Sequence, residues 1–237
     1  MQNEFLDRWK PSLNWETPPG ECLKNLLGIL PKEKDWNISV FGSAPLEMSF
    51  SHGFLSNDVD ILTRYQDLKE IEVLIDKNDL TPFKAKVGVQ ACIDGAFRTS
   101  PKWKDRTFNH EFENGILRFA HPMDILIGKI HRLDEKDLKA FNLVFSLTGE
   151  PSESTLKQEL IEAPDLFSFA HMDEFSPPFR KQVEKLWTRF YGKEIDVENE
   201  IVKEGISLLR KSFSIDKDFK RELIEKSIRL ETNSNSQ

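Results

Sequence analysis

The feature that most constrains the fold is a pair of short apolar segments, one ending in Gly-Ser and the other beginning with Asp-x-Asp. Residues 38–41 are largely apolar and end at Gly42-Ser43, and the second segment carries Asp58 and Asp60 at its start. Side chains alternate between the two faces of a strand, so residues spaced i, i+2 point the same way. Two carboxylates on one face repel each other unless a cation lies between them. Mg²⁺ prefers such oxygen ligands together with substrate phosphates.

Two further groups would complete a metal-dependent nucleotide site. Gly42-Ser43 at a strand end could place backbone N–H groups and a hydroxyl beside phosphates. Two-metal transfer sites usually have a third carboxylate on a neighbouring strand. Asp94 is the candidate, because it directly follows the apolar segment 87–93. The alternatives are an ordinary turn at Asp94-Gly95 and a solvated surface pair for the Asp-x-Asp.

Helical and strand patterns alternate over the first part of the chain and predict an α+β fold. Apolar spacing predicts helices and alternation predicts strands. An Asn-Gly pair within a hairpin predicts a turn. We expect helices over 21–30, 44–52 and 67–76, strands over 37–41, 59–63, 80–83 and 86–93, an ordered loop over 97–110 and a hairpin around 114–115.

A further helix is predicted to begin at Pro122. On a helical wheel, Lys129, Arg132 and Lys136 share one face, about a third of a turn from an apolar face. This cationic stripe suits a triphosphate, and the alternative is a solvated helix face. Asp134 is a candidate N-cap for a new helix within the same stretch.

A cluster of turn-forming residues at 149–154 is the clearest candidate for a domain boundary. We therefore expect a sheet-containing domain over 1–148 and a C-terminal helical domain over 149–237. The helices expected in the second domain are 155–162, 178–191, 194–212 and 216–230.

Charge and composition exclude several classes of protein. The net charge of −7 argues against a generally basic nucleic-acid binder. No segment approaches the roughly 20 apolar residues of a membrane span, so no membrane is expected. The acidic, amphipathic N-terminus is not typical of a signal peptide. Cys22 and Cys92 form no zinc pattern, and two reduced thiols fit a cytoplasmic protein.

Together, these motifs resemble the nucleotidyltransferase superfamily. Residues 42–43 followed by 57–60 resemble its opening motif. Residues 121–137, with a helix lysine followed by a basic-Asp pair, resemble the second signature of the AbiEii-type toxin branch and related minimal nucleotidyltransferases. Residues 101–106 resemble a loop between the two motifs in some of those proteins. The resemblance covers roughly residues 37–147 and implies a nucleotidyltransferase-like mixed β-sheet flanked by helices. It leaves the helical C-terminal part without a counterpart.

The resemblance implies a role for each acidic site residue. Asp58 and Asp60 would hold Mg²⁺. Asp94 would complete the metal-binding set and help to activate the acceptor hydroxyl. Asp137 would orient the preceding helix or its Lys129.

The resemblance also implies which residues bind the nucleoside triphosphate (NTP). Gly42 and Ser43 would contact its β- and γ-phosphates, and Lys129 would neutralise the triphosphate. Arginines common in the family are out of register here, and Arg132, one helical turn from Lys129 and Lys136, is the candidate substitute. This departure puts nucleotide choice in doubt more than metal binding.

The implied activity is transfer of a nucleoside monophosphate from ATP or another NTP to a hydroxyl of tRNA or protein, as the toxin of a toxin–antitoxin or phage-defence system, with an antitoxin as partner. One alternative is a catalytically weakened member that binds a nucleotide or a partner, which the out-of-register arginines favour. Another is an antibiotic-modifying nucleotidyltransferase, which needs an acidic pocket for a cationic drug. The acidic segment 150–237 keeps that alternative open.

Residues 97–110 hold side chains with two interpretations each. Arg98, Lys104 and Arg106 could extend a substrate-facing rim or be ordinary surface charge. Trp103 could stack on a base or anchor the loop. His121, before Pro122, is interpreted as structural rather than as a metal ligand.

Overall fold

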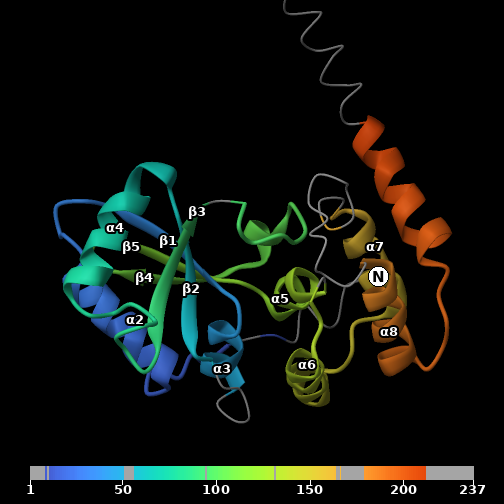
Figure 1. Ribbon diagram of the computed structural model, residues 1–237, viewed down its shortest axis with the longest axis horizontal. Helices are drawn as coiled ribbons and strands as arrows, with labels where there is room; N and C mark the ends of the chain where they lie inside the picture. The colour runs from blue at the N-terminus through green and yellow to red at the C-terminus, as the bar shows by residue number, and fades with distance from the viewer. Residues whose placement is uncertain are drawn as a thin grey trace, which may run out of the picture.

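Five strands form one mixed sheet in the order β3-β2-β1-β5-β4 (Figure 1). Strand β1 pairs antiparallel with β2 and parallel with β5, β2 pairs parallel with β3, and β4 and β5 form a hairpin. The computed structural model describes residues 9, 11–50, 56–93, 95–130, 132–163, 166 and 179–211. The strands are β1 Trp36–Phe41, β2 Asp58–Thr63, β3 Gly88–Ile93, β4 Phe108–Phe112 and β5 Gly115–Phe119. The expected α+β class, with a mixed sheet flanked by helices, is confirmed.

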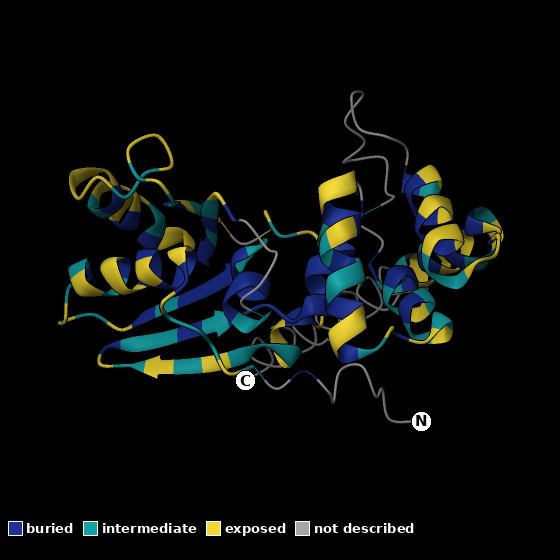
Figure 2. Ribbon diagram, turned by 90° about the horizontal axis from the view of Figure 1, so that it is seen from below, coloured by how far each residue is buried: buried dark blue, intermediate teal, exposed yellow. Residues whose placement is uncertain are grey.

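Three helices pack against the apolar face of this sheet. They are α2 Pro18–Ile29, α3 Ala44–Phe50 and α4 Tyr65–Lys77. Alternate strand residues, such as Val40 of β1 and Ile61 of β2, are fully buried in one cluster with Leu26 of α2 and Ile71 of α4. Figure 2 shows buried residues along the strands and exposed ones on the outer surfaces of the helices. The other strand residues, among them Asp58 and Asp60, therefore face the opposite side of the sheet.

The remaining helices lie beside the sheet, to its right in Figure 1. They are α5 Pro122–Lys129, α6 Glu135–Thr148, α7 Glu153–Ile161 and α8 Phe179–Tyr191, followed by a π-helical turn, Glu198–Val202, and a helical stretch over 203–211. Their buried side chains form a second cluster, which includes Phe141 of α6 and Trp187 of α8. This cluster draws on residues on both sides of residue 148, and the division into domains there stays a prediction. The helix expected over 216–230 lies outside the described residues.

Two expectations for the middle of the chain are wrong. Residues 80–83 form a turn in place of a strand, and the N–H groups of Lys84 and Ala85 both donate to the carbonyl of Thr81. Pro82, which has no N–H to donate, lies in this turn. Residues 97–110 are also not one loop, because they contain the 3₁₀ turn η1, Trp103–Arg106, and the start of β4.

The helix that begins at Pro122 is shorter than expected. It ends at Lys129, and Leu133 adopts a positive φ of 35° before α6 begins. Asp134 caps α6, as expected, by accepting a hydrogen bond of 2.8 Å from the backbone N–H of Asp137. The expectation that one continuous helix places Lys129, Arg132 and Lys136 on a single face is therefore wrong.

No helix in the described part of the chain has the length and apolar character needed to cross a membrane. Cys22 is buried, Cys92 is partly exposed, and both are free thiols.

Candidate functional site

Asp58 and Asp60 lie on one face of β2, next to the turn that ends β1. Asp60 pairs in register with Phe41, the last residue of β1. Gly42 follows with φ +71°, and a Cβ atom at this position would collide with Oδ2 of Asp60. The positive φ favours glycine, and any larger residue would also have to displace the Asp60 carboxylate. The Gly-Ser and Asp-x-Asp motifs are thus in direct contact through Gly42 and Asp60.

The electrostatic environment of Asp60 is unusual. Burial, together with the negative charge of Asp58, raises the pKa of Asp60 to about 6, while the positive charges of Lys129 and Arg132 oppose both effects. Within the described part of the chain, neither carboxylate accepts a side-chain hydrogen bond or ion pair. Two repelling carboxylates without donors offer hard oxygen ligands, which is the donor type that Mg²⁺ requires. These two residues therefore fit a divalent cation.

The third carboxylate proposed from the sequence, Asp94, lies outside the described residues. The register of β3 is nevertheless informative. Gln90 pairs with Asp60, and Ile93, the last residue of the strand, pairs with Thr63. Among the residues that the structure describes, no group of three or more His, Cys, Asp or Glu side chains could hold a metal. The β3 position beside Asp60 thus carries an amide, which the sequence pattern did not reveal.

The three predicted basic residues do not share one helical face, because Lys129 ends α5, Arg132 lies in the break that follows and Lys136 belongs to α6. Lys129 donates to Oδ1 of Asp137 at 2.8 Å. Arg132 holds both oxygens of the same carboxylate through contacts of 2.9–3.0 Å. Asp137 is only 2% exposed, and it therefore orients both cations. Lys136 acts on a different carboxylate, where its charge opposes the rise in the pKa of Glu47 that burial causes.

The cations and the carboxylates form one electrostatic unit. The charge of Arg132 acts on Asp60, and the charge of Asp58 in turn helps to raise the pKa of Arg132 against the opposing effect of burial. The Arg132 side chain is 55% exposed while it is held by Asp137, so its charge remains accessible from solvent. This arrangement can bind an anion next to a metal held by the two aspartates.

Glu47 is a site residue that the sequence analysis missed. Its buried carboxylate on α3 accepts the backbone N–H of Ser56 at 2.7 Å. The hydroxyl of Ser56 then donates to the carbonyl of Asp58 at 2.7 Å. Burial raises the pKa of Glu47, and the hydrogen bond from the Ser56 N–H opposes this rise. Because α3 begins directly after Ser43, Glu47 ties the Gly-Ser turn to the start of β2. The one local signal for Glu47 is its position in the first turn of that helix. An acidic residue there is explained equally well by the positive end of the helix dipole.

Arg106 fits neither of its two interpretations, substrate-facing rim or ordinary surface charge, because its side chain is only 15% exposed. Its guanidinium binds the buried carboxylate of Asp124, through Nη2 and through an Nε contact of 3.0 Å, and it also contacts Glu159 at 2.6 Å. The hydroxyl of Thr99 donates to the same Asp124 carboxylate at 3.2 Å. This ion pair joins η1, α5 and α7, and it is buried because its partners come from three distant parts of the chain.

The aromatic and imidazole residues near this ion pair have structural contacts. Nδ1 of His121 accepts the N–H of Met123 at 3.1 Å and caps α5, which confirms the structural interpretation. Trp103 is buried and meets Phe97 edge to face at 5.3 Å, an arrangement that anchors the loop. Stacking of Trp103 on a base stays a prediction.

Comparison with protein-family models, with curated proteins and with solved structures finds no match to this chain.

The raised pKa of Asp60 predicts how the folding stability changes with pH. An unfolded aspartate ionises near pH 4, at about 3.9, whereas Asp60 in the folded chain has a pKa of about 6. Its contribution to stability is therefore fully present below pH 4 and is lost as the pH rises through 6. We expect Asp60→Asn to be more stable than the wild type at pH 7.5, by about 1–3 kcal/mol, and similar to it at pH 3.5.

Urea unfolding at the two pH values, with and without Mg²⁺, measures this effect. Mg²⁺ should stabilise the wild type at pH 7.5, since a cation offsets the repulsion between Asp58 and Asp60. It should have no such effect on Asp60→Asn. Equal stabilisation of both proteins by Mg²⁺ would contradict the assignment of the two carboxylates as ligands.

Proposed function

We propose that this chain is a Mg²⁺-dependent nucleotidyltransferase, which transfers a nucleoside monophosphate from an NTP to a hydroxyl acceptor. One observation carries the proposal. Asp58 and Asp60 lie on one face of β2, against a glycine turn, with no side-chain donor among the described residues, and the charges of Lys129 and Arg132 act on Asp60. Paired carboxylates beside a cationic cluster match what a metal–triphosphate complex needs from a protein.

Asp58 and Asp60 would hold the metal, with Asp94 as the proposed third ligand. When bound, Mg²⁺ supplies positive charge that lowers the pKa of the attacking hydroxyl and stabilises the leaving pyrophosphate. Lys129 and Arg132, both oriented by Asp137, would neutralise the triphosphate.

The Gly42-Ser43 turn would contact the β- and γ-phosphates. The carbonyl of Ser43 already accepts the N–H groups of Leu46 and Glu47 at 3.1 Å, so the turn is held in place by the first turn of α3. A preorganised turn needs no rearrangement when the phosphates arrive, which is how positioning lowers a barrier.

In the transfer, one bond to the α-phosphorus replaces another. The acceptor oxygen forms a bond to the α-phosphorus while the bond from that phosphorus to the pyrophosphate oxygen breaks. The hydroxyl proton passes to a carboxylate base, a role proposed for Asp94 by resemblance, and the bond's electron pair leaves with pyrophosphate. The protein itself contributes positioning of the reactants and stabilisation of the developing charge, and these two effects lower the barrier to the transfer.

A second candidate function is a catalytically weakened member of the fold that binds a nucleotide or partner protein. The register of β3 favours it, because Gln90 occupies the position beside Asp60. An amide there cannot serve as a general base. Binding of an NTP without any transfer would support this candidate.

The acceptor and the biological role are inferred from sequence resemblance. A tRNA or protein acceptor, an antitoxin partner and a toxin or phage-defence role come from the resemblance alone. The antibiotic-modifying alternative requires an acidic pocket, whereas the cavity lined by Leu62 of β2 carries Arg98 and Lys104.

Calorimetric titration with each of the four NTPs, with and without Mg²⁺, tests the proposal. We expect Mg²⁺-dependent binding of at least one NTP, and we expect Arg132→Gln to weaken it about tenfold or more, or about 1.4 kcal/mol. The matched control is Lys139→Gln, which removes an exposed positive charge from the same region on α6. Incubation with α-labelled NTPs and a cell extract then shows whether label enters RNA, protein or a small molecule. Absence of Mg²⁺-dependent NTP binding would refute the proposal.

A further inference from the structure

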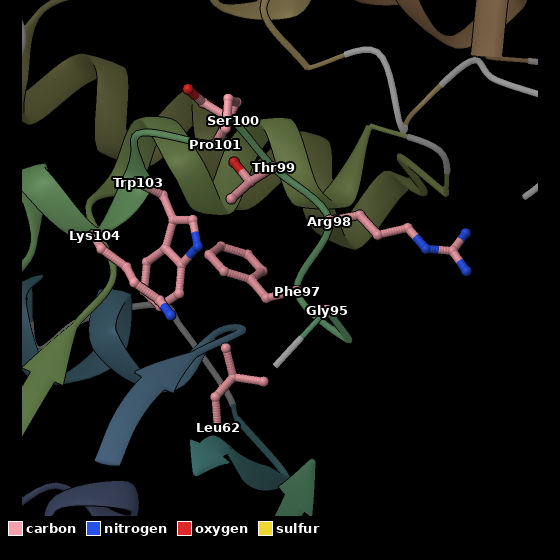
Figure 3. Close-up of a pocket in the computed structure, with 9 residues that line it drawn as sticks. All are labelled: Leu62, Gly95, Phe97, Arg98, Thr99, Ser100, Pro101, Trp103 and Lys104. Carbon is pink, nitrogen blue, oxygen red and sulfur yellow. The ribbon is translucent and has the colours of Figure 1, made fainter. Parts of the chain in front are cut away.

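A cavity of about 320 Å³ lies beside the candidate site. Figure 3 shows it between Leu62, at the end of β2, and the segment over 95–104, whose Phe97 and Trp103 rings lie side by side. The two rings meet edge to face at 5.3 Å. Phe97 also packs against Phe41 at 4.9 Å, so the aromatic wall is held from two sides.

The cavity opens on the same face of the sheet as the two aspartates. Leu62 follows Asp60 by two residues on β2 and therefore points to the same face. At the rise of a β-strand, the two Cα atoms are about 7 Å apart. Phe41, which supports the aromatic wall, is the register partner of Asp60. A ligand in the cavity could thus bring a hydroxyl to the carboxylates.

The rim of the cavity is cationic. Arg98 is exposed, and in Figure 3 its side chain extends away from the two rings. Lys104 is also exposed, and its ammonium lies 5.6 Å from the centroid of the Trp103 ring. None of the nine described residues that line the cavity is acidic. Aromatic side chains stack on planar heterocycles and a cationic rim attracts phosphate, so the cavity suits a planar ring that carries a negatively charged substituent.

Size and charge indicate a small ligand. The volume lies at the lower end of the range of about 300–1,000 Å³ for small-molecule sites. It suits one heterocycle with a sugar phosphate. The chain as a whole carries a net charge of −7, which disfavours a long polyanion.

We infer that this cavity is the acceptor subsite and that it takes a mononucleotide-sized molecule, with a planar heterocycle against Phe97 and Trp103 and a phosphate near Arg98 and Lys104. The assignment as acceptor rests on the proposed function, and a hydroxyl of this ligand would then take up the nucleotidyl group. Binding of the ligand itself needs neither metal nor NTP.

Calorimetric titration in EDTA with the four nucleoside 5′-monophosphates tests the inference. We expect one or more of them to bind, and to bind more tightly than either inorganic phosphate or the uncharged nucleoside, because both the ring and the charge contribute. Arg98→Gln combined with Lys104→Gln should weaken this binding at least tenfold. Lys86→Gln, which removes a charge outside the cavity, should leave it unchanged.

Two further variants test whether the monophosphate binds in this cavity or at the proposed metal and triphosphate site. Asp60→Asn should bind the monophosphate normally, so that loss of transfer and loss of the subsite are distinguishable. Arg132→Gln should also leave this binding intact. The inference is overturned if no monophosphate binds more tightly than phosphate, or if Arg132→Gln abolishes binding while the double variant retains it. It is equally overturned if a single-stranded oligonucleotide binds through Arg98 and Lys104 much more tightly than any monophosphate.

Discussion

Asp58→Ala and Asp60→Ala are each expected to reduce nucleotidyl transfer by about 10³-fold or more. Each change removes one of two neighbouring oxygen ligands, and metal stabilisation of the transition state is worth several kcal/mol, with about 1.36 kcal/mol for each factor of ten. Both side chains lie on the polar face of the sheet, outside the apolar core. The fold should therefore persist.

The measurement is release of pyrophosphate or incorporation of label at saturating NTP, with far-UV circular dichroism and thermal unfolding as checks on the fold. Asp105→Ala is the matched control, because Asp105 is an exposed aspartate on η1. If either site variant keeps turnover within tenfold of the wild type while folded, the proposed metal site is wrong. A folded wild type that binds NTP but transfers nothing would favour the weakened alternative.

Asp124→Ala is expected to destabilise the fold by about 2–4 kcal/mol, since it leaves the buried charge of Arg106 with the Glu159 carboxylate as its remaining described partner. Asp124 is fully buried, and Arg106 is only 15% exposed. Burial opposes the charged state of Arg106, but the carboxylates of Asp124 and Glu159 more than offset it and raise its pKa. The variant removes the Asp124 carboxylate, which contacts Arg106 through two nitrogen atoms, and frees η1 from α5.

Urea unfolding measures this loss. The control is Glu113→Ala, which breaks an ion pair with Lys32 whose side chains are 70% and 71% exposed. Such exposed pairs contribute about 0–1 kcal/mol. Should Asp124→Ala fail to fold, the triple variant Asp124→Leu/Arg106→Met/Glu159→Gln removes all three charges of this cluster and should recover most of the stability. A loss below about 1 kcal/mol in Asp124→Ala would contradict the buried ion pair.

The sequence predicts structure correctly where a feature depends on residues that are close together in the chain. Strands β1 and β2 follow from short apolar runs, and the hairpin between β4 and β5 follows from its turn residues. The cap at Asp134 follows from an Asx side chain that satisfies a backbone N–H three residues on. Each of these features depends on neighbours within a few residues.

Prediction fails where partners are distant in sequence or where a backbone donor is lacking. The apolar residues of 80–83 resemble a strand, but Pro82 cannot donate to a sheet and the segment turns instead. Arg106 has the pattern of a rim residue, yet its partner Glu159 is 53 residues away. Nothing in a local pattern encodes such a pairing.

The sequence by itself determined that two aspartates share one face of a strand and that a Gly-Ser turn ends another, because strand periodicity and turn chemistry are local properties. Only the tertiary structure decided that Gly42 presses against Asp60, that Gln90 stands beside it, and that Lys129 and Arg132 meet on Asp137. These contacts depend on strand register and on a helix break, which are settled by packing across the whole chain and not by any single segment.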